Sequence, residues 1–132
     1  MHILHTTLCY YPSQAGGPAN ALYWINKTLN PSFFSSKIIA TQLGINKLND
    51  NLSITKHSKN HEAFYLKDSG KFYIKKSYNE LKKSDIIQFS SLFFPPTFPI
   101  LFYAIIKNKT IVISPRGELY EAAIKRKKIL KK

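Results

Sequence analysis

Residues 85–115 read DIIQFSSLFFPPTFPILFYAIIKNKTIVISP, and this stretch decides the fold. The apolar run at 85–91 predicts a buried strand, and the polar residues and prolines that follow predict a loop. Residues 99–109 predict an apolar helix, and the β-branched residues of 110–115 predict a second strand. A strand, a helix and a strand in this order indicate a parallel β-α-β unit.

The same stretch raises the question of a membrane span. Residues 86–106 carry no charge and are long enough to cross a bilayer. However, Pro95, Pro96 and Pro99 fall in the middle of the run. Because prolines inside a helix remove backbone hydrogen bonds that lipid cannot replace, we reject a transmembrane span here.

The first part of the chain repeats this alternation. Residues 2–8 predict a central strand, 17–30 a helix with apolar residues at helical spacing (Ala21, Leu22, Ile25 and Leu29), and 36–42 a second strand. Together with the stretch above, this order predicts an α/β fold, a Rossmann-like parallel sheet flanked by helices.

Residues 43–80 form the least regular part of the prediction. The polar residues of 43–60 predict a loop, and 62–68 with 71–76 predict a strand pair joined by a tight turn at Ser69-Gly70. Residues 77–84 predict a short polar helix. The chain closes with a predicted helix over 117–132, of which 120–132 is strongly basic and suits the negative end of the helix dipole.

The net charge of +13 favours an acidic partner or an anionic membrane surface, although a solvated lysine face explains it equally well. Six of the cations lie in KRKKILKK at 125–132, and the rest of the chain carries +7. Only Arg116 and Arg126 are arginines, so specific reading of nucleic-acid bases is not expected.

The lone cysteine, Cys9, excludes an intramolecular disulfide and predicts a small buried apolar residue rather than a nucleophile. No secretory signal is visible, and the single cysteine suits a reducing interior. His57 and His61 are four residues apart but not in a predicted helix, so no metal site is assigned, and His5 is expected in the core.

Ligands of parallel sheets bind at the loops after the carboxyl ends of the strands, which here are 9–17, 90–97 and 114–119. Gly16 and Gly17 either form an ordinary turn or leave backbone N–H groups open to a phosphate at a helix start. The pattern is neither a dinucleotide fingerprint nor a phosphate-binding P-loop. Phe93 and Phe94 are expected to pack against the following helix.

Polar side chains in two of these loops are candidate ligand contacts. Ser90 and Ser91 end the strand at 85–91, and Arg116 with Glu118 follows the strand at 110–115. The guanidinium of Arg116 suits two-point binding of a phosphate or carboxylate, and the alternative is a surface ion pair with a nearby glutamate.

Three segments in this order resemble the N-terminal half of the family 4 glycosyltransferases, which have the GT-B fold. They are ILHTTLCYYPSQAGGPANALYWINKTL, DIIQFSSLFFPPTFPILFYAIIKNKTIVISPRGEL and the basic region after them. The resemblance implies transfer of a sugar from a nucleotide sugar, with retention of configuration and without a metal or other cofactor. The acceptor implied is a glycan or a lipid-linked sugar in cell-surface polysaccharide biosynthesis. The resemblance also implies a location that is either cytoplasmic or peripheral at the inner membrane face.

The resemblance also implies roles for individual residues. Arg116 lines the acceptor side of the cleft as the candidate catalytic residue, and Gln88 stands where many relatives carry a histidine. The residues implied to bind substrate or phosphate are Gly16, Gly17, Asn20, Ser90, Ser91, Arg116 and Glu118.

The family's second, donor-binding domain has no counterpart in this sequence. Residues 1–132 are therefore expected to form an acceptor-side N-terminal domain that is inactive alone, and to self-associate or need a second subunit. Two alternatives stay open: a non-enzymatic basic module that binds polyanions or anionic membranes, and a small independent nucleotide-binding α/β protein.

Overall fold

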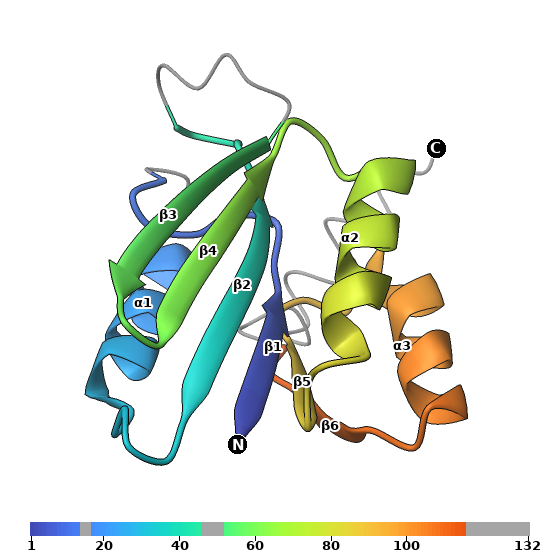
Figure 1. The fold of residues 1–132 in the computed structure, drawn as a ribbon. Coiled ribbons are helices and arrows are strands. Elements are labelled where there is room, and N and C mark those ends of the chain that lie inside the picture. The colour runs from blue at the N-terminus through green and yellow to red at the C-terminus, as the bar shows by residue number, and fades with distance from the viewer. Residues whose placement is uncertain (14–16, 46–51, 116–132) are drawn as a thin grey trace.

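A computed structural model describes residues 1–13, 17–45 and 52–115 and shows an α/β fold (Figure 1). The sheet has six strands in the order β3-β4-β2-β1-β5-β6. In chain order, the elements are β1 (His2–Thr6), α1 (Gly17–Thr28), β2 (Ser35–Thr41), β3 (Leu52–Ser58), β4 (His61–Leu66), α2 (Lys71–Leu81), β5 (Ile86–Phe89), α3 (Thr97–Ile106) and β6 (Thr110–Ile113).

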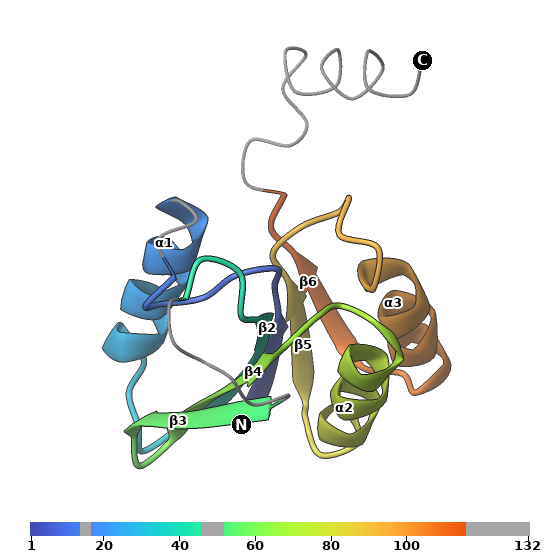
Figure 2. The same cartoon turned by 90° about the horizontal axis from the view of Figure 1, so that it is seen from above.

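The sheet is mostly parallel. Only β3 runs antiparallel to its neighbour β4, and every other neighbouring pair is parallel. Figure 2 shows α1 on one face of the sheet, and α2 and α3 side by side on the other. The predicted parallel sheet flanked by helices is therefore confirmed at the level of an α/β fold.

Each face of the sheet has its own apolar core. On the α2 and α3 face, Leu4, Ile39 and Ile87 come from three neighbouring strands and pack with helix residues such as Tyr73 and Ile100. On the α1 face, the core residues are Tyr10, Leu22, Ile38, Ala40, Ala63 and Tyr65. Burial on both faces explains why the central strands are apolar runs rather than alternating ones.

Two predictions for the segment 43–80 are wrong. Residues 71–76, predicted as a strand, form the first part of α2, which continues through residues predicted as a separate helix. The predicted loop at 43–60 contains β3, which extends the sheet by pairing with β4. The strand predicted at 62–68 corresponds to β4.

The uncharged stretch 86–106 divides as predicted into β5, a loop and α3. Among the residues that the structure describes, no helix is long and apolar enough to cross a membrane. Phe94 is buried in the core beside α3, as predicted, whereas Phe93 is exposed. The predicted helix at 117–132 lies outside the described residues.

The predicted apolar stripe on α1 is only partly right. Leu22 is buried, but Ile25 is exposed. The buried face instead passes through Ala19, Leu22 and Asn26, and the Asn26 side chain bonds to the carbonyl of Leu22 at 2.9 Å. The Nδ2 of this buried amide has a backbone partner, whereas its Oδ1 has none among the described residues.

Candidate functional site

The loops predicted to carry function meet at one edge of the sheet. Since β1, β5 and β6 are parallel neighbours, their carboxyl ends lie together. Backbone hydrogen bonds continue the alignment beyond the strands: Ser90 N–H donates to the Thr6 carbonyl at 3.2 Å, and Ser114 N–H donates to the Phe89 carbonyl at 2.9 Å. We call this edge, with residues 6–13, 17–20, 88–91 and 114–115, the carboxyl edge.

Gly17 begins α1 at this edge with an open backbone. The residue is exposed, and a Cβ added to it would meet no described atom within 4 Å. Neither close packing nor a left-handed φ therefore requires glycine at this position. The first N–H groups of a helix lack partners inside the helix, so this position suits an anion. Asn20 lies exposed one turn further along α1.

Two buried hydroxyl groups at the carboxyl edge have no hydrogen-bond partner among the described residues. They are Ser90 Oγ and Thr6 Oγ1. Sequence reasoning selected Ser90 but missed Thr6. The only indication in the sequence was that Thr6 is polar and lies near the end of an apolar strand. A buried hydroxyl without a partner costs about 1–3 kcal/mol, and the usual reason is a bound water or ligand.

Gln88 is held in place by its neighbour across the strands. Its side-chain Nε2 donates to Ser114 Oγ at 3.0 Å. Gln88 is also the register partner of His5, which is buried in the middle of the sheet as predicted. The amide thus occupies a fixed position on the α1 face, one residue before Phe89 ends β5. Ser91, also predicted to bind substrate, accepts a hydrogen bond at its backbone carbonyl from Thr97 Oγ1 at 2.9 Å.

Three of the predicted site residues, Gly16, Arg116 and Glu118, lie outside the described residues. The structure brings the remaining four, Gly17, Asn20, Ser90 and Ser91, to the carboxyl edge through α1 and the loop after β5. Cys9, in the loop after β1, is half-buried, and burial raises the pKa of its thiol. A raised pKa disfavours the reactive thiolate.

Sequence reasoning also missed a cluster of histidine and tyrosine rings on the α1 face of the sheet. His57 on β3 and His61 on β4 have ring centroids 5.0 Å apart. The Tyr10 hydroxyl lies 2.6 Å from His61 Nε2, and Tyr65 OH donates to the Tyr11 carbonyl. Because Tyr10 and Tyr11 belong to the loop after β1, these contacts hold that loop against β3 and β4.

Burial alters the proton affinities in this cluster. It lowers the pKa of His61 to about 4, with a further contribution from the nearby His57, and lowers the pKa of His57 as well. Burial raises the pKa of Tyr10. Both histidines are therefore neutral near pH 7; His61 is a buried hydrogen-bonding residue and His57 is half-buried. Over the described ranges of the chain, no three His, Cys, Asp or Glu residues come together as a metal site would require.

Two hollows flank the sheet at opposite edges. An open one of about 430 Å³ lies at the carboxyl ends of β1, β2 and β4, between Leu8, Thr41 and Lys67. A pocket of about 410 Å³ lies where the strands begin, lined by residues such as Lys37 and Glu80. No residue of this second pocket was predicted as a site residue.

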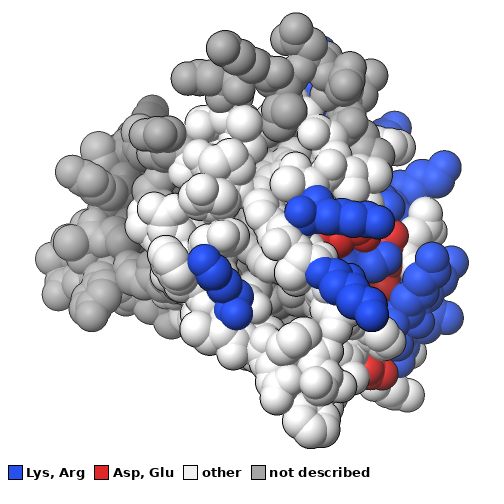
Figure 3. All heavy atoms as spheres, turned by 60° about the vertical axis from the view of Figure 1, so that its left-hand side comes forward, with Lys and Arg blue, Asp and Glu red and all other residues white. Residues whose placement is uncertain are grey.

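The second pocket is lined by four lysines (Lys37, Lys56, Lys59 and Lys83) and two glutamates (Glu62 and Glu80). Glu80 pairs with Lys37 at 2.8 Å and with Lys76 at 2.9 Å. Burial of Glu80 opposes its ionisation, but the hydrogen bonds from the two lysines outweigh it and lower the pKa of the carboxyl. On the side of the molecule seen in Figure 3, acidic side chains accordingly lie among lysines.

Comparisons with protein-family models, with curated proteins and with solved structures gave no match to this chain.

Proposed function

We propose that this chain forms the acceptor-side wall of the catalytic cleft in a retaining glycosyltransferase that uses a nucleotide sugar. The observation that carries the proposal is that the open backbone of Gly17, at the start of α1, and the unpartnered hydroxyl of Ser90, after β5, both lie at the carboxyl edge. The mostly parallel sheet supports it, because such sheets bind ligands beyond the carboxyl ends of their strands. The sequence resemblance supplies the reaction class.

In this proposal the start of α1 receives the diphosphate of the donor. Free N–H groups and the positive end of the helix dipole stabilise negative charge, which increases on the diphosphate as the bond to the sugar breaks. The hydroxyls of Ser90 and Thr6 gain partners when sugar or phosphate oxygens arrive. A second domain or subunit supplies the opposite wall, so binding is the quantity to measure on this chain alone.

The proposal is tested by titrating the isotope-labelled protein with a nucleoside diphosphate and recording amide chemical shifts. The expected result is that shifts concentrate at Gly17, Ser90 and Ser114, with none over α2. Shifts confined to the pocket around Lys37, or no shifts for any nucleotide, would contradict the proposal.

The substitution Gly17→Ala separates binding from folding. Because the added methyl meets no described atom, the melting temperature is expected to stay unchanged or to rise slightly, as alanine favours helices. The methyl does block a close approach of phosphate to the backbone, so affinity for the nucleoside diphosphate is expected to fall about tenfold, the loss of about one hydrogen bond.

The matched control is Gly70→Ala, the same change at the start of α2. Its Cβ would lie 2.9 Å from Asp68 Oδ1, which accepts a hydrogen bond from the Gly70 N–H at 2.8 Å, so a small loss of stability is expected. Affinity should remain at the wild-type value in this variant. An equal loss of affinity in both variants would show that Gly17 has no special place in binding.

A further inference from the structure

The outer face of α3 is apolar and exposed to solvent. Ile100 and Ala104 point into the core, whereas Phe98, Phe102, Ile105 and Ile106 point outward with 56% to 67% of each residue exposed. The outward residues recur at intervals of four, three and one, and so form one stripe along the helix. A contiguous group of large exposed apolar side chains indicates an interaction surface.

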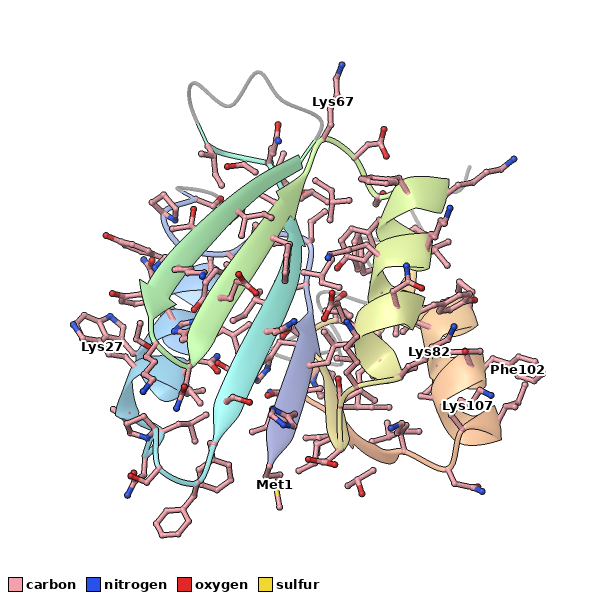
Figure 4. The ribbon with its side chains drawn as sticks, in the orientation of Figure 1. Met1, Lys27, Lys67, Lys82, Phe102 and Lys107 are labelled. Atoms are coloured by element: carbon pink, nitrogen blue, oxygen red, sulfur yellow. The ribbon has the colours of Figure 1, made fainter. Side chains whose placement is uncertain are left out.

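Lysines flank this stripe. Lys82 follows the end of α2 and Lys107 follows the end of α3, and Figure 4 shows both on the same side of the molecule as Phe102. The two helices are in contact, with the Tyr78 and Tyr103 rings 4.4 Å apart. Across the described part of the chain, neither lysine has a carboxylate partner.

No acidic group lies on the stripe itself. Helix α3 contains no charged residue, and the only acid of α2, Glu80, is buried against Lys37 and Lys76 on the inner side. The surface is therefore apolar in the middle and carries Lys82 and Lys107 at its margin. Apolar side chains with flanking lysines suit the boundary between the acyl chains and the headgroups of a membrane with anionic lipids.

We propose that the stripe Phe98, Phe102, Ile105 and Ile106, with Lys82 and Lys107, docks on an anionic membrane surface. The apolar rings enter the headgroup boundary and the lysines contact lipid phosphates. A second copy of the chain is a poorer occupant, because a symmetric contact brings equal cationic margins together. The segment 125–132, with its six cations, would meet the same repulsion. This inference does not depend on the transferase proposal.

A tryptophan reporter tests the docking directly. The natural Trp24 lies on α1, far from this face, and is 58% exposed. Its emission should stay unchanged when vesicles of phosphatidylcholine and phosphatidylglycerol are added. In the variant Trp24→Phe/Phe102→Trp, the emission should shift to the blue with those vesicles, and should not shift with phosphatidylcholine alone.

Two variants, each with a control, measure by vesicle co-sedimentation how much the apolar stripe and the flanking lysines contribute to membrane binding. Phe98→Ser/Phe102→Ser should reduce binding at least tenfold, and Phe33→Ser, which changes a ring that is 68% exposed elsewhere, should not. Lys82→Gln/Lys107→Gln should reduce binding about twenty-five-fold, since each lysine near an anionic surface contributes about fivefold. The control Lys27→Gln/Lys67→Gln removes the same charge away from the stripe and should reduce binding much less (Figure 4).

Circular dichroism and urea midpoints confirm that each variant is folded, which is expected because the changed side chains are exposed. The proposal is overturned if the two double lysine variants lose the same amount of vesicle affinity, because the total charge of the protein then explains the binding. Unchanged binding of the phenylalanine variant overturns it as well. The proposal is also overturned if sedimentation equilibrium shows a dimer and Phe98→Ser/Phe102→Ser dissociates it. The stripe then binds a second copy of the chain.

Discussion

Acidification from about pH 7 to about pH 4 is expected to destabilise the fold by about 3 kcal/mol through His61 alone. The pKa of this buried imidazole is about 4 in the folded protein, against 6.5 for an ordinary histidine. The difference corresponds to about 1.4 kcal/mol for each pKa unit. The measurement is a series of urea unfolding curves across this pH range.

The direction follows from the protons that each state binds. Near neutral pH, His61 is neutral in both states and contributes nothing. Below about pH 6.5 the unfolded chain binds a proton at His61 and the folded protein does not, so acid favours unfolding. The effect grows until the pH reaches the folded pKa and then levels off. His57, whose pKa burial also lowers, adds to the effect in the same direction.

His61→Gln is the matched variant. Glutamine keeps a polar group near the Tyr10 hydroxyl, which now lies 2.6 Å from Nε2, but cannot titrate. Between about pH 7 and about pH 5 the variant should lose about 2 kcal/mol less stability than the wild type. Parallel stability curves for the two proteins would mean that His61 is protonated while folded, contrary to its burial.

The order of most strands and helices along the chain could be predicted because these elements have strong local sequence patterns. The β-branched and apolar runs of β1, β2, β5 and β6 identify strands, although β6 at the edge of the sheet is largely exposed, and the alternation with helices identifies a parallel sheet. By contrast, α2 was predicted in part as a strand. Its buried positions are Tyr73, Ser77, Glu80 and Leu81, a helical spacing. Since two of the four are polar, apolar periodicity could not reveal it.

The site was predictable only in outline, for a similar reason. Parallel strands bring their carboxyl ends together, so the loops at 9–17 and 90–97 could be placed side by side from the sequence. The unpartnered hydroxyl of Thr6 could not be foreseen, because whether a threonine finds a partner depends on tertiary contacts. The proximity of His57 and His61 depends on the pairing of β3 with β4. The polar residues of β3 form no pattern that predicts a strand.

Tyr73→Phe is expected to cost about 2 kcal/mol of unfolding free energy, although it removes one oxygen atom. The Tyr73 ring is fully buried, and its hydroxyl lies between the ends of β1 and β2. Thr7 N–H donates to this oxygen at 3.1 Å, and the hydroxyl donates toward the carbonyls of Thr7 at 2.9 Å and Ile39 at 2.8 Å. Phenylalanine fills the same volume, so the cost comes from lost hydrogen bonds rather than from a cavity. The Thr7 N–H keeps its bond to the Ile39 carbonyl at 3.0 Å, whereas the Thr7 carbonyl loses the hydroxyl that donates to it.

The loss should also reach the candidate site, since Thr7 opens the loop that leads to α1 and the Tyr73 ring packs edge-on against Phe94 at 5.3 Å. Amide hydrogen exchange in residues 7–13 is therefore expected to speed up more than in α3. Tyr78→Phe is the control: its half-buried hydroxyl makes one bond, to the Pro99 carbonyl at 3.2 Å, and its loss should cost less than about 1 kcal/mol. Equal costs for the two variants would show that the backbone at the end of β1 does not depend on the Tyr73 hydroxyl, and that α2 holds the site's first loop by apolar packing alone.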